Sequence, residues 1–499
     1  MNRAILDKIK HLRNKKKIKL GLAHGVFDVL HIGHIGYFEE AKKKVDFLIV
    51  SVTDDKYVNK APGKPIFKID QRIQMLRSVK CIDLVIKSSH ETSIPIIREI
   101  KPNIYFKGKD YLDNFDITKN ILKEEKEVKK YGGNIFYTSS ETFSSSKLIN
   151  SEFDYLNPEV KKLFKKNNFS KIKNKFYNQF SKKIKKKILI IGDPILDIYN
   201  YVNPSGKSNK ANIISTQFKT KKIYAGGSLL VSNLLSEFCE NVTYLTLSNK
   251  SNDGYFKKFL KKGIKINTFK SDAKIIKKNR FIDEYSNLKL FQVTENENNN
   301  ISKIEEMHML NFLKKNHKNY DKIFIFDFGY YTLTKKLIKF TNKILFHKKI
   351  INCQSNSYNY GFNIFLKHTN SNIMCIDELE FRLAVNNKTS DIKTLIKENI
   401  RILNKYKIFI ITLGKKGCFV VQDKKISFIP TVLNKAIDTI GCGDIFITIF
   451  GILNLSNKFD ILEKALISHI AAGIHAYTPG NEMKINFMKL YKSLDNILK

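Results

Sequence analysis

Two histidines near the start of the chain, His31 and His34, are spaced so that they can act on one phosphate group. An apolar run and a glycine-containing turn precede them, and a helix-like segment follows. Both imidazoles are therefore expected near the beginning of a helix, where free backbone N–H groups and the helix dipole favour anions. Such donors suit nucleotidylyl transfer, in which charge develops on the attacked phosphoryl group and on the leaving pyrophosphate. The alternative is a pair of surface histidines at a helix start.

A second candidate for phosphate chemistry is the turn Gly441, Cys442 and Gly443, which Asp444 follows directly. The apolar run from Ile445 to Leu455 comes next and predicts a buried helix. Successive backbone N–H groups of such a turn form an anion-binding nest at a helix start. The nest would hold a transferring phosphoryl group, while Asp444 would accept the proton of an attacking hydroxyl. The alternative is an ordinary loop with an aspartate that caps the helix.

The elements that must position the two histidines form a regular series over residues 18–140. Short apolar runs alternate there with helix-like polar segments such as Ile35–Lys44 and Gln71–Val79. This is the βαβ pattern of a parallel sheet with helices on its faces. The predicted strands are Leu20–Ala23, Phe47–Val52, Leu84–Ile86, Ile104–Phe106 and Asn134–Thr138.

A second series of predicted strands and helices positions Asp444. We expect a first domain over residues 1–150, a lysine-rich helical or extended linker over 151–185, and a second domain over 186–499. The second domain opens with the apolar strand Ile188–Asp193, and its later strands include Ile323–Phe326 and Ile408–Thr412. Residues Ile198 to Ala225 alternate in a strand-like way, which suits a small β lid beside a larger α/β body.

Composition narrows the class of protein. The chain has 499 residues, 42% of them hydrophobic, which is enough for two globular domains. The net charge of +41 would suit nucleic acid, but the lysines are spread along the chain, with abundant Asn and Ile and no Trp. An AT-rich genome explains this pattern, so we expect no specific nucleic-acid partner. Six cysteines without a Cys-x-x-Cys pair, no signal peptide and no membrane-length apolar run predict a cytoplasmic protein that does not bind membranes.

The first series resembles the cytidylyltransferase-like family over about residues 18–150. The family's G-x-F-D turn and H-x-G-H signature match Gly25–Asp28 and His31–His34, and three further elements follow in order: Asp70–Arg72, Lys107–Tyr111 and Ser144–Lys147. The resemblance implies that His31 and His34 are catalytic. It also implies nucleotide binding by Gly25, Phe27, Lys60, Lys64, Arg72, Ser144, Ser145 and Ser146, and substrate binding by Asp28, Lys107 and Asp110.

The second series resembles the ribokinase-like (PfkB) carbohydrate kinases over about residues 186–499. Asp438–Asp444 matches the family's D-T-x-G-A-G-D signature with Cys442 in place of alanine, and Gly192–Asp197 resembles the opening sugar-contacting strand. The resemblance implies that Asp444 is catalytic and that Asp377 and Glu380, at the position of N-x-x-E, lie near Mg²⁺. It also implies substrate binding by Asp197, Gly226, Gly227 and Arg280, and nucleotide binding by Thr412, Gly414, Gly417, Gly441, Cys442 and Gly443.

Two positions depart from the kinase pattern. Leu230 stands where the family has a sugar-binding asparagine, and Asp377 replaces the asparagine of N-x-x-E. A leucine side chain cannot hydrogen-bond a hydroxyl group. Either the acceptor differs from the family's common sugars, or the kinase site is weak.

Together the resemblances imply an α/β protein with a Rossmann-like nucleotidyltransferase domain and a ribokinase-like α/β domain that carries a small β lid. The combination resembles the bifunctional heptose kinase/adenylyltransferases with the domain order reversed. It implies an enzyme that makes a nucleotide-activated, heptose-like sugar for surface polysaccharide such as lipopolysaccharide. The substrates would be a sugar or sugar phosphate, with ATP for the kinase, ATP or CTP as nucleotidyl donor, and Mg²⁺; the protein would form a homodimer through the kinase lid.

Two other functions stay open. One is a glycerol-phosphate-type cytidylyltransferase whose degenerate kinase domain regulates or dimerises it. The other is a basic nucleic-acid-binding protein on a borrowed fold.

Overall fold

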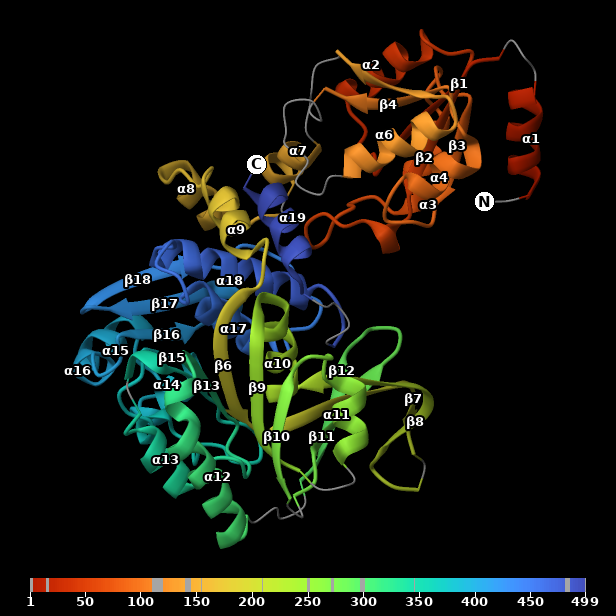
Figure 1. Cartoon of the computed structure of the whole chain (residues 1–499). Helices are drawn as coiled ribbons and strands as arrows, with labels where there is room; N and C mark the ends of the chain where they lie inside the picture. Colours follow the sequence, from red (N-terminus) through yellow and green to blue (C-terminus); the bar gives the residue numbers. More distant parts are fainter. Residues whose placement is uncertain are drawn as a thin grey trace. The chain divides into compact units, whose positions relative to one another are not determined.

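The computed structural model describes residues 3–14, 18–109, 120–139, 145–153, 155–208, 210–248, 252–270, 273–296, 301–344, 346–480 and 485–498. The chain forms two compact units (Figure 1). One comprises Met1–Tyr155 with Asp495–Lys499, and the other comprises Leu156–Leu494. No helix within these described ranges is both long and apolar enough to cross a lipid bilayer.

The first unit is built on a five-stranded parallel sheet with the strand order β3-β2-β1-β4-β5. Alternate side chains such as Ile49 and Val50 belong to two separate core clusters, as expected for a parallel sheet covered on both faces. The strand order reverses between β1 and β4, and ligands of such sheets bind there, beyond the carboxyl ends of the strands. The strands are β1 (Leu20–Gly25), β2 (Phe47–Thr53), β3 (Leu84–Ser88), β4 (Ile104–Gly108) and β5 (Asn134–Thr138). The helices are α1 (Arg3–Asn14), α2 (Ile32–Lys42), α3 (Ile69–Arg77), α4 (Ile94–Ile100), α6 (Asn120–Lys130) and α7 (Ser145–Glu152).

The second unit contains a nine-stranded sheet in the order β10-β9-β6-β13-β14-β15-β16-β17-β18. Neighbouring strands from β10 to β16 are parallel, whereas β17 and β18 add in antiparallel fashion at one edge. Helices α10, α17 and α18 pack together on one face, and α12, α13 and α14 lie on the other (Figure 1).

The strands of this sheet are β6 (Ile184–Gly192), β9 (Cys239–Ser248), β10 (Lys265–Lys270), β13 (Lys322–Asp327), β14 (Lys349–Cys353), β15 (Ile373–Asp377), β16 (Ile408–Thr412), β17 (Gly417–Gln422) and β18 (Lys425–Pro430). The helices are α10 (Gly227–Phe238), α11 (Asp253–Phe259), α12 (Lys303–Asn316), α13 (Lys335–Thr341), α14 (Glu378–Ala384), α15 (Ile392–Glu398), α16 (Ile400–Leu403), α17 (Cys442–Leu453), α18 (Ile461–Ala476) and α19 (Phe487–Ile497). The apolar run after Asp444 thus forms the buried helix α17 that the sequence predicts.

A separate four-stranded sheet, which we call the lid, has the order β12-β11-β7-β8. It contains β7 (Pro194–Lys207), β8 (Ile214–Gly226), β11 (Ile276–Asp283) and β12 (Lys289–Glu295). Only Asp193 separates β7 from β6, so the lid continues directly from the large sheet. The predicted lid residues, Ile198 to Ala225, cover β7 and β8. Sequence reasoning missed β11 and β12.

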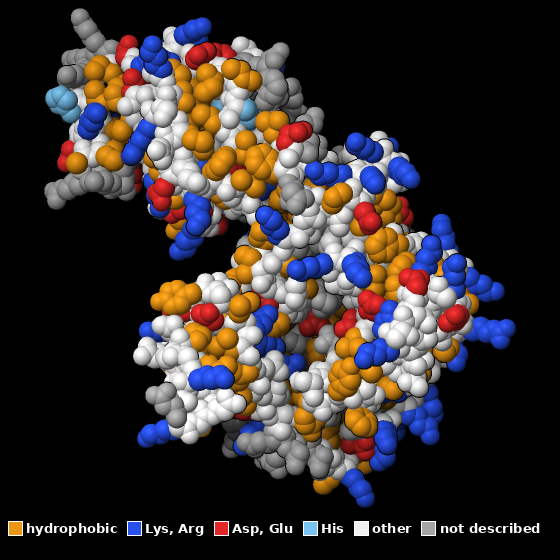
Figure 2. Space-filling model, turned by 180° about the vertical axis from the view of Figure 1, so that it is seen from behind, with side chains coloured by type: hydrophobic (Ala, Val, Ile, Leu, Met, Phe, Trp, Pro, Cys, Tyr) orange, Lys and Arg blue, Asp and Glu red, His pale blue; other side chains and the backbone are white. Residues whose placement is uncertain are grey.

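The lysine-rich stretch over 151–185 folds mostly as helices of the second unit. These are α8 (Pro158–Lys166) and α9 (Ile172–Phe180), which bury Val160, Phe176 and Phe180. Its lysines lie on the solvent-facing sides of amphipathic helices. More widely, Lys and Arg side chains are scattered over the visible surface of both units rather than gathered in one patch (Figure 2).

Candidate functional site

His31 and His34 lie beyond the carboxyl end of β1, where the strand order of the first sheet reverses. The loop after β1 contains two residues with positive φ, Phe27 at 51° and Val29 at 52°, before His31 begins α2 as its N-cap. The two imidazole rings stack with their centroids 3.8 Å apart and an interplanar angle of 19°. Nε2 of His31 lies 3.1 Å from Oγ of Ser145, the first residue of α7. The fold therefore brings the predicted histidine pair and one predicted serine together.

Burial determines the protonation of the histidine pair. Burial, with smaller effects of His31 and Lys60, lowers the pKa of His34 to about 3. Burial and Lys60 also lower the pKa of His31. Both rings are therefore neutral near pH 7, and each carries one N–H donor. Nδ1 of His34 is buried without a hydrogen-bond partner among the described residues, so this atom is available to a bound ligand.

Arg72 and Asp28, both predicted to bind ligands, point into the protein. Arg72 has no exposed surface, and Asp28 is also buried. The Asp28 carboxylate accepts hydrogen bonds from the backbone N–H groups of Ile66, at 2.8 Å, and Phe67, at 3.1 Å. These two side chains hold the loops that flank the histidines. The acceptors of the Arg72 guanidinium are the carbonyl oxygens of Val26, Thr53 and Phe67 and the carboxylate of Asp55.

The three predicted lysines differ in their surroundings. Lys60 lies close enough to lower the pKa of both histidines. Lys64 is buried, with Nζ 4.9 Å from the ring centroid of Tyr155. Lys107 is buried at the end of β4 and forms an ion pair with Glu124 at 2.8 Å. Lys60 is therefore the lysine whose charge acts on the histidine pair most directly.

Of the remaining predicted residues of the first site, Gly25, Phe27 and Ser146 are described in the structure. Gly25 ends β1, and a Cβ there would lie 3.0 Å from the ring of Phe27. That ring contacts His34 edge-on, with centroids 5.5 Å apart. Oγ of Ser146 donates a hydrogen bond of 2.7 Å within the first unit. The predicted residues Asp110 and Ser144 lie outside the described residues.

A third buried histidine, His24, was not predicted. It lies on β1, and its ring nitrogens contact Oγ of Ser51 at 3.1 Å and Oγ1 of Thr53 at 3.4 Å. Burial and the charge of Lys107 lower its pKa to about 3. The neutral ring joins β1 to β2. An imidazole placed among apolar residues of a predicted strand is the signal that would have identified it.

Asp444 lies in the first turn of α17 and is buried. Burial raises its pKa to about 7, although a hydrogen bond of 2.5 Å from Nε2 of Gln354 opposes this shift. The carboxylate can therefore change its charge near neutral pH, which suits a group that accepts a proton during a reaction. Gln354 was not predicted. It directly follows β14 at the carboxyl edge of the sheet, and that position is the signal that would have identified it.

The turn before Asp444 has the conformation that an anion-binding nest requires. Gly441, the N-cap of α17, is left-handed with φ of 78°. A Cβ on Gly443 would meet no described atom within 4 Å, so the space beside the turn is open. Sγ of Cys442 lies 3.6 Å from the carbonyl oxygen of Ala472 in α18. The thiol therefore packs toward that helix.

Asp438 connects the nest to the lid. One of its carboxylate oxygens accepts hydrogen bonds from the Tyr199 hydroxyl, at 2.5 Å, and from the backbone N–H of Gly480, at 2.8 Å. The other accepts a hydrogen bond of 2.6 Å from Nζ of Lys289. Burial opposes ionisation, but these bonds lower the pKa of Asp438. A single buried carboxylate thus holds β7 and β12 to the loop before α17.

The predicted sugar-binding residues meet where the lid joins the large sheet. Asp197 on β7 forms a buried ion pair with Arg280 on β11. Gly226 and Gly227 connect β8 to α10. A Cβ on Gly226 would lie 2.2 Å from Oδ2 of Asp197, and Gly227 has φ of 52°, which favours glycine. Arg280 and Gly226 therefore lie against the Asp197 carboxylate, and Gly227 adjoins Gly226 at the start of α10.

Asp377 and Glu380, predicted to lie near a metal ion, form the N-terminal cap of α14. Oδ1 of Asp377 accepts the backbone N–H of Glu380, and Oε2 of Glu380 accepts that of Asp377, both at 2.7 Å. Oε1 of Glu380 accepts the backbone N–H of Ser355 at 2.9 Å. Burial and the charge of Asp377 raise the pKa of Glu380 to about 8. Since both carboxylates already accept backbone donors, they fit contact with the water shell of Mg²⁺ better than direct ligation.

Thr412, Gly414 and Gly417, predicted to lie near the nucleotide, follow one another at the end of β16. Gly414 has φ of 56°, and a Cβ there would meet no described atom within 4 Å. Gly417 has φ of 129°, and its Cβ would lie 2.2 Å from the carbonyl oxygen of Ile429. Gly414 thus leaves open space beside the strand end, whereas Gly417 permits the close pairing of β17 and β18.

Asp327, Cys353 and His368 place three groups able to bind a metal within 4.8 Å of one another. However, Nε2 of His368 and Nζ of Lys367 both lie 2.7 Å from Oδ2 of Asp327. A cation would have to displace the ammonium group, so this cluster is built as an ion pair. The backbone carbonyl of Asp327 accepts the N–H of Gln354 at 2.9 Å, and the cluster therefore fixes the residue that contacts the predicted catalytic aspartate.

Two family models match the chain. The model described as cytidylyltransferase-like matches residues 22–151, and the model described as pfkB family carbohydrate kinase matches residues 185–457. These matches confirm both resemblances and the α/β class predicted from the sequence.

Curated relatives match in the N-terminal domain. A protein of Helicobacter hepaticus described as "Bifunctional protein HldE" is 36% identical over 115 residues, which are 23% of this chain and 24% of the relative. A protein of Pseudomonas fluorescens with the same description is 38% identical over 117 residues, which are 23% of each chain. The matched part is thus about a quarter of the length of these relatives.

Solved structures match the fold of the second unit. Phosphofructokinase-2 from Escherichia coli, in complex with substrates and products, superimposes with a TM-score of 0.51 and 14% identity, covering 63% of this chain and 100% of that chain. The same enzyme in complex with potassium gives a TM-score of 0.50 and 13% identity over the same shares of the two chains. At these identities the likeness concerns the fold alone.

Because the Asp197 carboxylate lies so close to Gly226, a methyl group at position 226 should destabilise the second unit. We expect Gly226→Ala to lower the free energy of unfolding of the second unit by about 1–3 kcal/mol, because the side chain would overlap the carboxylate. Denaturant-induced unfolding measures this difference. Gly443→Ala is the matched control, since its Cβ meets no described atom within 4 Å. Equal losses of stability in both variants would contradict the prediction.

Proposed function

Since the chain belongs to the pfkB family of carbohydrate kinases and also carries a cytidylyltransferase-like domain, we propose that it catalyses two consecutive reactions. The kinase unit phosphorylates a sugar or sugar phosphate, and the first unit transfers a nucleotidyl group to a sugar 1-phosphate. The observation that carries the proposal is the neutral, stacked histidine pair at the strand-order reversal of the first sheet. The fusion is chemically coherent because the first reaction makes the kind of substrate that the second consumes.

In nucleotidylyl transfer, a phosphate oxygen of the acceptor attacks the α-phosphorus of a nucleoside triphosphate, and the bond to the β-phosphate breaks to release pyrophosphate. His31 and His34 donate N–H groups to the phosphoryl oxygens, where negative charge increases in the transition state. Lys60, whose charge acts on both rings, supplies a cation for the leaving group. Because both rings are neutral and held by packing, the donors need little reorganisation during the reaction.

In the kinase reaction, the acceptor hydroxyl gives its proton to the Asp444 carboxylate while its oxygen bonds to the γ-phosphorus of ATP. The bond between this phosphorus and the β–γ bridging oxygen breaks, and ADP leaves. The N–H groups of the Gly441–Gly443 turn hold the transferring phosphoryl group. Lys278 on β11 interacts electrostatically with both Asp444 and Asp197, and therefore supplies positive charge to the acceptor side.

Magnesium completes the kinase site in this proposal. Asp377 and Glu380 would hold the water shell of Mg²⁺, which neutralises charge on the ATP phosphates when bound. Without the cation, burial and Asp377 keep the pKa of Glu380 near 8, so Glu380 is largely protonated at neutral pH. A divalent cation near this pair favours its ionised form.

The identity of the sugar, of the nucleotidyl donor and of the product is proposed from the resemblance to the bifunctional heptose kinase/adenylyltransferases. We propose a heptose-like sugar, ATP or CTP as nucleotidyl donor, and a nucleotide-activated product for surface polysaccharide, made in the cytoplasm where nucleoside triphosphates are available. A homodimer would form through the lid. Phe218, Phe291 and Val293 support this assembly, because all three are exposed apolar side chains of lid strands.

Removing the N–H donor of His34 should slow nucleotidylyl transfer strongly and leave the fold intact. We expect His34→Ala to slow pyrophosphate release by about 100–1,000-fold, the usual cost of losing one transition-state hydrogen bond. Release is followed with each nucleoside triphosphate and a panel of sugar 1-phosphates. His90→Ala, which replaces an exposed histidine, is the matched control. The nucleotidyltransferase half of the proposal fails if wild-type protein releases no pyrophosphate with any pair.

The pKa of Asp444 predicts how the kinase responds to pH. As pH rises through about 7 the carboxylate loses its proton, so kcat/KM should increase between pH 6 and 8 and then level off. Gln354→Leu removes the hydrogen bond that favours the ionised form. We therefore expect its midpoint to move to higher pH by about one unit.

The pH profile of ATP consumption measures this effect. Gln74→Leu, an exposed glutamine of α3 in the first unit, is the control and should keep the wild-type midpoint. A midpoint that is the same in Gln354→Leu and wild type would rule out Asp444 as the titrating group.

Leu230 favours a second candidate, a cytidylyltransferase with an inactive, regulatory kinase unit. Its half-buried side chain lies in the first turn of α10, three residues after Gly227, and offers no donor or acceptor to a sugar. ATP consumption with sugars and sugar phosphates decides between the candidates. Turnover that falls by about 1,000-fold or more in Asp444→Asn would exclude the regulatory candidate. Turnover that is absent from wild type would favour it.

A further inference from the structure

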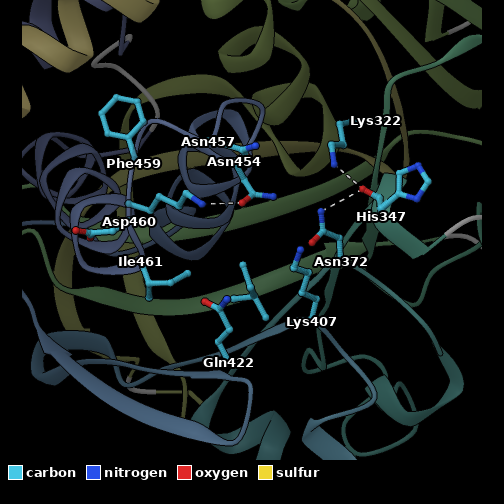
Figure 3. Close-up of a pocket in the computed structure, with 12 residues that line it drawn as sticks. Lys322, His347, Asn372, Lys407, Gln422, Asn454, Asn457, Phe459, Asp460 and Ile461 are labelled. Atoms are coloured by element: carbon cyan, nitrogen blue, oxygen red, sulfur yellow. Dashed lines mark hydrogen bonds between the residues drawn. The ribbon is translucent and has the colours of Figure 1, made fainter.

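A polar pocket lies at the amino edge of the nine-stranded sheet, away from the edge that holds Asp444 (Figure 3). Its walls come from the first residues of β13 and β16, the end of α17 and the beginning of α18. The volume is about 510 Å³. This is the size of a site for a small molecule. Asp444 lies in the first turn of α17 and Asn454 follows the last residue of this helix at the pocket, so roughly 15 Å of helix separates the two places.

Three lysines line this pocket: Lys322, Lys407 and Lys464. None of them forms a salt bridge with a described residue. Lys322 donates to the backbone carbonyl of His347, and Lys464 donates to Oδ1 of Asn454 at 2.8 Å. Both partners are neutral oxygens, which satisfy a hydrogen bond but leave the positive charge uncompensated.

Only one carboxylate lines the pocket, and it is already engaged in the fold. Oδ1 of Asp460 accepts the backbone N–H of Glu463 at 2.8 Å as the cap of α18. Three ammonium groups therefore share the cavity with a single acid. Burial lowers the pKa of both Lys322 and Lys464, and the charge of Lys407 lowers both further. Asp321, outside the pocket lining, acts in the opposite direction on Lys322, and Asp460 does so on Lys464. Lys407 therefore lies near enough to both of the other ammonium groups to repel them in the absence of an anion.

Neutral donors and a helix dipole add to the positive lysines. The side-chain amide of Asn372 donates to the same carbonyl as Lys322, at 3.1 Å, and Asn457 and Gln422 also line the cavity (Figure 3). The 16-residue helix α18 begins here, so the positive end of its dipole faces the pocket region. Ammonium, amide and helix-dipole groups together are the chemistry that binds tetrahedral oxyanions.

We propose that this pocket is a binding site for a small phosphate-bearing anion, of the class of inorganic phosphate, pyrophosphate or a phosphate monoester. Charge excess, donor type and cavity size all match such a ligand. The site is independent of the kinase centre, because it is made by the opposite edge of the sheet. It does not depend on the proposed reactions, although these would release or consume anions of the same class.

Titration calorimetry of the full chain tests the proposal. Phosphate, pyrophosphate and glycerol phosphate are titrated in parallel at constant ionic strength. Their order of affinity shows which source of the phosphate group the pocket prefers. Lys407→Gln removes one exposed ammonium group, so the fold should persist, and thermal unfolding verifies this. We expect about tenfold weaker binding at one site, the effect of losing one charged hydrogen bond.

Variants outside the pocket separate it from the catalytic sites. His34→Ala and Asp444→Asn should leave pocket binding unchanged, and so should Lys393→Gln, an exposed lysine of α15. Lys322→Gln is a second pocket variant and should weaken binding by a similar factor. The proposal is overturned if both pocket variants bind all three anions as wild type does. It is also overturned if acetate binds wild-type protein as tightly as phosphate.

Discussion

Parallel strands end at a common edge of their sheet, and both candidate active sites depend on this constraint. β1 leads to the histidine pair in the first unit. In the second unit, β6, β13 and β14 bring Asp193, Asp327 and Gln354 to one edge. Hydrogen bonds then fix these groups: the Asp193 carboxylate, for example, accepts the backbone N–H of Thr332 at 2.8 Å. The positions of the polar groups therefore follow from strand register, and a loop has to contribute only the final turn.

The packing that fixes these groups also sets their charge. Burial moves each group toward its neutral form, which lowers the pKa of His34 to about 3 and raises that of Asp444 to about 7. The consequences differ because the roles differ. A neutral imidazole is a stable donor over the whole physiological range, whereas a carboxylate that titrates near pH 7 can take up a proton and return it. One physical effect thus prepares the first site for charge stabilisation and the second for proton transfer.

The sequence predicts where the sites lie better than it predicts the partners of their side chains. Gly226 and Gly227 are recognisable because Gly226 leaves room for the Asp197 carboxylate and Gly227 has a positive φ that favours glycine. Arg72 shows why other residue types are less informative. A basic residue at a helix start is equally compatible with a phosphate ligand and with the buried acceptors it has here, among them the carbonyl of Val26, 46 residues earlier in the chain. Gln354 belongs to no motif, and its role appears only when β14 and α17 are placed side by side.

The surroundings of individual lysines show which of them reflect only the lysine-rich composition and which belong to a binding site. A net charge of +41 spreads lysine over exposed surfaces, where each ammonium group stays hydrated at little cost. Two other inward-facing lysines are each paired with a carboxylate, Lys107 with Glu124 and Lys289 with Asp438. Lys322 and Lys464 have lost hydration without forming an ion pair with a described residue, and the charges of Asp321 and Asp460 offset only part of this cost, because the pKa of each lysine is still lowered. If these lysines reflected only the composition of the chain, their ammonium groups would be expected to stay hydrated at the surface. Their convergence on one cavity is better explained by an anion that offsets the cost when it binds.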